Sequence, residues 1–136
     1  MAIDYGQKRV GLAVTDEAQI IATALDTVHV KDIFQYLKQY VEKENVSNFV
    51  VGEPKQLNNT PSESVRFVDP FVKKLRKEFP LISVERYDER FTSKMAFQSM
   101  IDMGMKKKDR RDKANIDKIS AVILLQSYMN YLAGNK

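Results

Sequence analysis

Residues 2–15, "AIDYGQKRVGLAVT", decide the fold that the rest of the chain can adopt. Residues 2–5 and 8–15 predict two strands joined by a tight turn at Gly6. Asp4 ends the first apolar run, although aspartate is depleted in strands and common in turns. Asp4 is therefore either a turn residue of a hairpin or a metal ligand held on a sheet, and the choice depends on the other carboxylates.

The sequence beyond the hairpin predicts alternating strands and helices. Three sequential strands predict an antiparallel meander, and later strands that alternate with helices predict a parallel extension of the same sheet. We therefore expect one α/β domain, residues 1–136, with a mixed five-stranded sheet covered by helices. The further strands are expected at 20–30, 48–54 and 81–90, and the helices at 32–45, 62–79, 93–103 and 115–132, the last with an apolar face of Ile116, Ile119, Val122, Ile123 and Leu125.

The composition limits the classes of protein to which the chain can belong. Hydrophobic residues make up 43% and charged residues 29%, which is typical of a soluble globular domain. The absence of cysteine excludes disulfides and thiolate metal sites and favours the cytoplasm. The N-terminal residues show no basic-then-apolar signal pattern, and no apolar run approaches the length of a membrane span, so no membrane partner is predicted. The net charge of +4 is compatible with nucleic acid.

Acidic residues lie at the ends of strands and in the first turn of the last helix. Functional groups of α/β proteins gather at the carboxyl ends of the strands and in the adjoining segments. Asp4 ends the first strand, Asp88 and Glu89 end the last strand, and Asp117 lies in the first turn of the last helix. Converging carboxylates repel one another unless divalent cations neutralise them. Oxygen ligands favour Mg²⁺ or Mn²⁺, and two such ions about 3.5–4 Å apart can promote phosphodiester cleavage.

Each of these carboxylates also has a purely structural interpretation. Asp117 near a helix N-terminus could complement the helix dipole. Asp88 and Glu89 could form ion pairs with Arg86 and Arg90. The combination of the acids, rather than any one of them, predicts a metal site.

The stretches "AIDYGQKRVGLAVTD", "NFVVGEP", "YDERFTS" and "NIDKISAVILLQ" make the chain similar to the YqgF/RuvX family. The resemblance covers essentially the full chain. It implies an RNase H-like fold and a metal-dependent nuclease of the kind described as Holliday junction resolvases or pre-16S rRNA nucleases. By position, Asp4, Glu89 and Asp117 match the family's acids and Gly6 its turn glycine. Asp88 is left as a neighbour of the site, because adjacent strand residues point to opposite faces.

The chain departs from the family pattern after its central strand. Glu53 stands between Gly52 and Pro54, where the family commonly has an apolar residue, and "KQLNNTPSES" follows at 55–64. Glu53 is either a further metal ligand or a loop acid paired with Lys55 or Arg90.

Basic residues gather next to the predicted acidic site. Residues 106–113, "KKKDRRDK", lead directly into the helix that carries Asp117, so they are expected to contact backbone phosphates; as an isolated charge run they would form a solvated loop. The predicted phosphate contacts are Lys8, Arg9, Arg90, Lys106, Lys107, Lys108, Arg110 and Arg111, with Lys113 closing the run.

Competing functions are limited by length and by the intact acids. A two-domain ATPase of the actin-like kind, which shares the first motif, does not fit in 136 residues. A non-catalytic nucleic-acid-binding or ribosome-assembly factor with the same fold remains the alternative to a nuclease. The sequence leaves open whether the substrate is a four-way DNA junction or precursor rRNA, and it predicts a monomer or a weak homodimer.

Overall fold

The computed structural model describes residues 1–6, 8–16, 21–53, 65–88 and 113–134. Among them, five strands and three helices alternate along the chain much as the sequence predicts. These elements are β1 (Ala2–Tyr5), β2 (Arg9–Thr15), β3 (Ala22–His29), α1 (Ile33–Lys43), β4 (Asn48–Glu53), α2 (Val65–Glu78), β5 (Ser83–Asp88) and α5 (Lys113–Gly134).

The five strands form one mixed sheet in the order β3-β2-β1-β4-β5. Strands β1, β2 and β3 pair antiparallel as a meander, and β4 and β5 extend the sheet in parallel with β1. This topology confirms the predicted α/β class and is consistent with an RNase H-like fold. It puts β1, the strand that carries Asp4, in the middle of the sheet.

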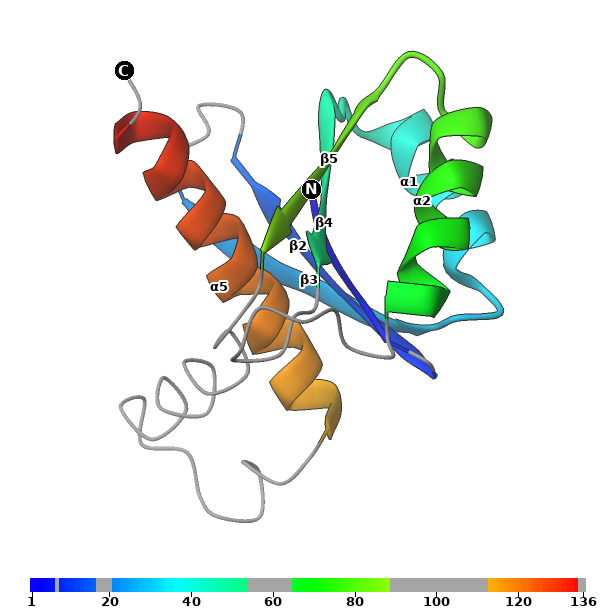
Figure 1. The fold of residues 1–136 in the computed structure, drawn as a ribbon, viewed down its shortest axis with the longest axis horizontal. Coiled ribbons are helices and arrows are strands. Elements are labelled where there is room, and N and C mark those ends of the chain that lie inside the picture. Colours follow the sequence, from blue (N-terminus) through cyan, green and yellow to red (C-terminus); the bar gives the residue numbers. More distant parts are fainter. Residues whose placement is uncertain (7, 17–20, 54–64, 89–112, 135–136) are drawn as a thin grey trace.

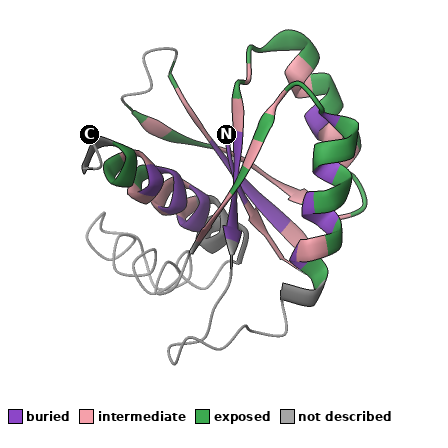
Figure 2. Ribbon diagram, turned by 45° about the horizontal axis from the view of Figure 1, so that its top comes forward, coloured by how far each residue is buried: buried purple, intermediate pink, exposed green. Residues whose placement is uncertain are grey.

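Helices cover both faces of the sheet, α1 and α2 on one side and α5 on the other (Figure 1). The side of α1 and α2 holds the larger core, built from bulky side chains that alternate along the strands. Figure 2 shows buried positions along the central strands and on the sheet-facing sides of the helices. The fully buried large residues of this core include Ile3, Leu12, Ile33, Leu37, Phe49, Val68 and Leu75.

The core beneath α5 is built from small residues. Ala2 of β1, Ala13 of β2 and Ala121 of α5 are fully buried together with Leu124 and Leu125. Small side chains let a helix approach a sheet closely, because no Cβ branch separates the two backbones.

The apolar face predicted for the last helix is therefore only partly right. Leu125 is buried, but Ile119, Val122 and Ile123 are half-buried, and the buried positions are Ser120, Ala121, Leu124 and Tyr128. Apolar residues lie on all sides of this helix, so their spacing does not select one face.

The ends of several elements differ from the prediction. Strand β5 begins at Ser83 rather than at Leu81, because the chain turns there and the Ile82 amide donates to the Phe79 carbonyl at 3.1 Å. Helix α5 begins at Lys113, so that residue belongs to the helix rather than to the basic run. The helix predicted at 93–103 lies outside the described residues. Across the described part of the chain, no helix has the length and apolar character to cross a membrane.

Candidate active site

Asp4 lies on the face of the sheet that α5 covers. Side chains alternate along a strand, and in β1 Ala2 packs in the core beneath α5 while Ile3 packs in the core beneath α1 and α2. Asp4 is two residues after Ala2 and half-buried, so it belongs to the row that faces α5. Its cross-strand partner in β2 is Gly11.

Helix α5 brings the position of Asp117 to the same side. Position 117 precedes Ala121 by four residues, and residues four apart share one side of a helix. Ala121 belongs to the same buried cluster as Ala2, which is two residues before Asp4. The first turns of α5 lie toward the end of the sheet where β4 and β5 finish (Figure 1). The backbone positions of the two acids thus flank one close contact between α5 and β1, although the Asp117 side chain is outside the described part.

Positions 53 and 88, the other two acids at strand ends, belong to the rows of strand residues that face α1 and α2. Position 53 shares a row with Val51, which packs in the core beneath α1 and α2. Position 88 is paired with Glu53 and shares a row with Arg86, whose Nη1 lies 2.7 Å from the Asp69 carboxylate of α2. The backbone register therefore separates positions 53 and 88 from Asp4.

Part of the predicted site lies outside the described residues. This applies to Glu89, Arg90 and the basic residues 106–112, which include Lys106, Lys107, Lys108, Arg110 and Arg111. Within the described residues, no group of three His, Cys, Asp or Glu side chains is placed to hold a metal ion.

The hairpin next to Asp4 is closed by backbone contacts at Gly6. The Gly6 amide donates to the Arg9 carbonyl at 3.0 Å, and a Cβ added to Gly6 would lie 2.7 Å from that oxygen. A side chain at position 6 would force the turn open, so close approach of the backbone explains this glycine. The turn carries the exposed Lys8, and Arg9 begins β2 opposite His29.

Burial changes the protonation of two groups at the ends of β1. The Met1 amino group donates to the Asn48 carbonyl at 2.9 Å, and burial lowers its pKa to about 6. Burial raises the pKa of the Tyr5 phenol, so that side chain is neutral in the physiological range.

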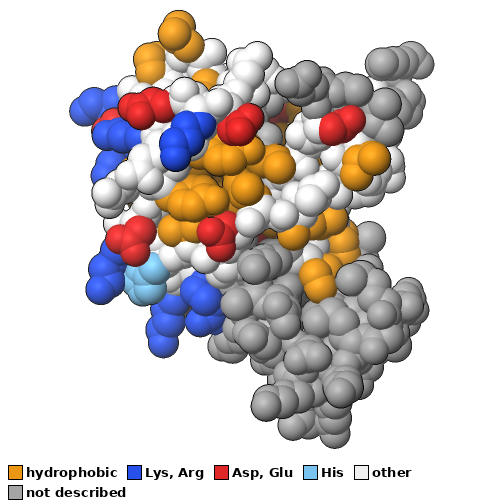
Figure 3. Space-filling model, turned by 180° about the vertical axis from the view of Figure 1, so that it is seen from behind, with side chains coloured by type: hydrophobic (Ala, Val, Ile, Leu, Met, Phe, Trp, Pro, Cys, Tyr) orange, Lys and Arg blue, Asp and Glu red, His pale blue; other side chains and the backbone are white. Residues whose placement is uncertain are grey.

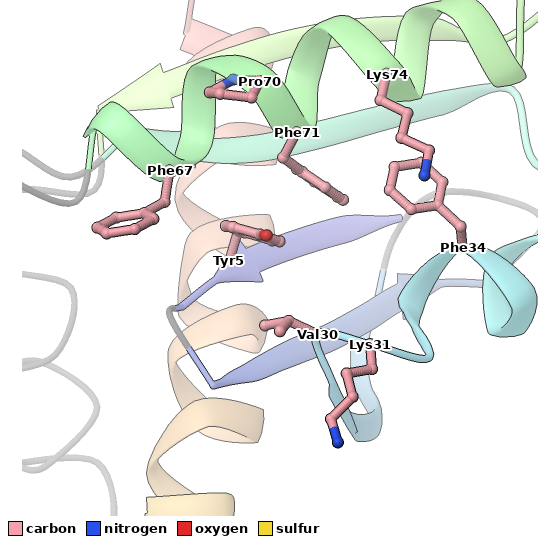
Figure 4. A pocket seen from close by; sticks show the side chains of 8 residues that line it. All are labelled: Tyr5, Val30, Lys31, Phe34, Phe67, Pro70, Phe71 and Lys74. Carbon is pink, nitrogen blue, oxygen red and sulfur yellow. The ribbon is translucent and has the colours of Figure 1, made fainter.

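A groove on the α1 and α2 side was not predicted from the sequence. It has a volume of about 440 Å³, and its lining side chains come from β1, the segment after β3, α1 and α2 (Figure 4). The sequence signal was weak, because Phe34 and Phe71 sit in helical apolar stripes that predict core residues. The lining residues are Tyr5, Val30, Lys31, Phe34, Phe67, Pro70, Phe71 and Lys74.

Comparison with known proteins assigns the chain to a family. The family model described as "RuvX: Holliday junction resolvase" matches residues 1–131. Three relatives each carry the name "Putative pre-16S rRNA nuclease" and align over 129 residues, 95% of this chain. The relative from Flavobacterium psychrophilum is 54% identical over 94% of its length, and that from Phocaeicola vulgatus is 56% identical over 93%. The relative from Christiangramia forsetii is 52% identical over 96% of its length. The chain belongs to the RuvX family of Holliday junction resolvases.

Proposed function

We propose that the chain is a divalent-metal-dependent endonuclease with Asp4, Glu89 and Asp117 as its catalytic acids. Membership of a nuclease family supports the reaction class. The observation that carries the assignment of residues is the buried cluster that Ala2 and Ala121 share, because the strand position of Asp4 and the helix position of Asp117 then lie on one side of the sheet. Glu89 follows β5 two residues after Tyr87, whose hydroxyl lies 2.9 Å from the Ser127 hydroxyl of α5.

The chemistry of this acid set fits Mg²⁺ or Mn²⁺. All three side chains offer carboxylate oxygens, and the chain has no cysteine. Bound as a pair, such ions supply an activated water and stabilise charge on the leaving oxygen in phosphodiester hydrolysis. Asp4, Glu89 and Asp117 hold the ions in this proposal, and the register leaves Glu53 and Asp88 outside the set.

Basic residues around the site hold the sugar–phosphate backbone in the same proposal. Lys8 is exposed in the hairpin turn beside β1, and Arg9 begins the next strand. Arg90 follows Glu89, and the run Lys106, Lys107, Lys108, Arg110 and Arg111 precedes α5. Contacts of this kind position the substrate without reading its sequence.

The proposed substrate is the precursor of 16S rRNA, because the relatives at 52–56% identity carry that name. The chain would then act in the cytoplasm, in agreement with its lack of cysteine, and as a monomer of one domain. The family description favours a second candidate, a four-way DNA junction. Resolving a junction requires two active sites and therefore a dimer.

Parallel cleavage assays test the proposal. Precursor rRNA and a four-way DNA junction are incubated with the protein and Mg²⁺ or Mn²⁺, and with the Asp4→Asn variant. We expect Asp4→Asn to lose more activity than the roughly 10–100-fold that changes in outer-shell metal partners cost. Asp32→Asn, an exposed acid at the start of α1, is the matched control.

The assays also separate the alternatives. Asp4→Asn with near wild-type cleavage would exclude Asp4 as a metal ligand. Tight binding of either substrate without cleavage, in both metals, would favour the non-catalytic assembly factor.

A further inference from the structure

The groove between α1 and α2 has the chemistry of a binding site for an unpaired nucleotide. Tyr5 and Phe71 stack on each other with ring centroids 4.2 Å apart, and Phe34 lies 5.4 Å from Phe71, which is 4% exposed, so these rings form the floor of the groove. Phe67, at the start of α2, is 48% exposed and lines one end of the groove (Figure 4). Base stacking on exposed aromatic rings is the main sequence-tolerant contact of proteins with single-stranded nucleic acid.

The charges around the groove are complementary to phosphate. Among the described residues that line it, the only charged side chains are Lys31 and Lys74, and both are exposed. The Lys74 Nζ lies 4.5 Å from the Phe34 ring centroid, which holds the cation over the groove. Asp32, the acid next to Lys31, is the N-cap residue of α1 and does not line the groove.

Further cations lie beside this site. The Val30 amide donates to the Lys8 carbonyl at 3.0 Å, so the hairpin turn borders the groove. Arg9 is paired with His29, and the Lys31 amide donates to His29 Nδ1 at 3.1 Å. Figure 3 shows blue Lys and Arg side chains gathered next to the pale blue His29. A nucleic-acid strand that leaves the groove over the hairpin therefore meets a positive surface.

The groove is also joined to the candidate active site through β1. Tyr5 lines the groove, and the preceding residue, Asp4, faces α5 on the other side of the sheet. A strand that passes around the end of β1 can therefore reach both. A volume of about 440 Å³ is in the range of small-molecule sites and can receive a single base.

We propose that this groove binds an unpaired nucleotide of the substrate strand, with its base against the exposed ring of Phe67 and its phosphate toward Lys31 and Lys74. The inference rests on the proposed nuclease function and narrows its substrate to nucleic acid with unpaired nucleotides next to the cleaved bond. A flexible single strand fits this requirement, whereas a fully paired duplex does not.

A tryptophan reporter tests the groove directly, because the chain has no tryptophan of its own. Phe67→Trp places the indole in the groove, and Leu81→Trp places it at a residue that is 97% exposed and outside it. Both variants are titrated with a short oligouridylate and with a blunt RNA duplex of equal length, in EDTA so that cleavage plays no part. We expect the single strand to quench Phe67→Trp and to leave Leu81→Trp unchanged. Equal quenching by the duplex, or no quenching, would overturn the proposal.

Affinity measurements provide the second test. Phe67→Ala should weaken oligouridylate binding about five- to hundredfold, because stacking contributes about 1–3 kcal/mol per base. Lys74→Ala should lower the slope of log affinity against log salt by about 0.7. Blunt-duplex affinity should stay within about twofold for Phe67→Ala. Unchanged oligouridylate affinity in both variants would reject the site, and tighter binding of an apolar peptide would assign the groove to a protein partner instead.

The two proposals fail in distinguishable ways. Binding in EDTA does not require the metal site, and the same titrations can be run with Asp4→Asn. Loss of cleavage in Asp4→Asn with unaltered binding in Phe67→Ala would reject the groove and keep the nuclease. Quenching of Phe67→Trp together with no cleavage by the unaltered protein in either metal would keep the groove and reject the nuclease, and full cleavage by Asp4→Asn would reject only the assignment of Asp4. If Phe67→Ala does not fold, Phe67→Trp and Lys74→Ala carry the test.

Discussion

The two faces of the sheet are built from side chains of different size. Beneath α1 and α2 the core consists of bulky residues such as Phe49, Leu37 and Leu75. Beneath α5 the core contains three fully buried alanines, Ala2, Ala13 and Ala121. Large buried side chains supply most of the hydrophobic stabilisation, whereas small ones allow close approach. The face beneath α1 and α2 therefore supplies most of the stability, whereas the face beneath α5 sets the distance between β1 and α5, the elements that carry Asp4 and Asp117.

The largest expected effect on stability is that of Leu75→Ala. Leu75 of α2 is fully buried, and the change should lower the free energy of unfolding by about 2–5 kcal/mol. Cleavage per folded molecule should not change, because the altered core lies on the face opposite Asp4. Urea unfolding and cleavage at low temperature check both expectations, with the exposed Leu81→Ala as control. A loss of cleavage in the folded Leu75→Ala protein would contradict the division between the faces.

The pH dependence of the free energy of unfolding should reflect titration of the Met1 amino group. Met1 belongs to the core beneath α1 and α2. The ordinary pKa of its amino group is 8.0, and burial lowers it to about 6 in the folded protein. Between these values the unfolded chain binds more protons, so this stabilisation is present above pH 8 and is lost as the pH falls toward 6. A protein that starts at Met1 should lose about 2–3 kcal/mol over this range.

Urea unfolding at several pH values measures this loss. His29→Gln removes the chain's one imidazole and serves as the background. A variant extended by two residues before Met1 should lack the dependence. An equal pH dependence with and without the extension would refute the assignment to the amino group.

Ala121→Leu tests the close packing of α5. The added side chain has no space between α5 and the alanines of β1 and β2, so overpacking should cost about 1–3 kcal/mol. It should also reduce cleavage about tenfold, because displacing the helix moves Asp117 relative to Asp4. Gln126→Leu adds the same side chain at an exposed position of α5 and should change neither quantity. Full cleavage by Ala121→Leu would mean that this contact does not set the geometry of the site.

The smallest effect is expected for Glu53→Gln. Position 53 belongs to the row that faces α1 and α2, so activity and the Mg²⁺ concentration for half-maximal cleavage should stay within about twofold. A Mg²⁺ titration of the two proteins measures this. A large rise in the required Mg²⁺ would bring Glu53 into the metal site.

The sequence predicted the topology well and the packing of the last helix poorly. The meander and the parallel strands were predicted correctly, because the alternating hairpin at 2–15 and the short apolar run before Gly52 both have the pattern of strands. In α5, apolar residues surround the axis, and only the alanines of β1 and β2 determine that Ala121 faces the sheet. The groove escaped prediction because Tyr5, Phe34 and Phe67 come from three elements that meet only in the folded chain.

The central place of β1 has a consequence for synthesis on the ribosome. Strand β1, which carries Asp4, pairs with β2, the next strand in the sequence, and β3 completes the meander at His29. Helix α5, which completes the proposed site, begins only at Lys113. Local contacts form before long-range ones, so during synthesis the hairpin of β1 and β2 can form while α5 is still missing. Under the proposed function, cleavage therefore requires that α5 has already been synthesised.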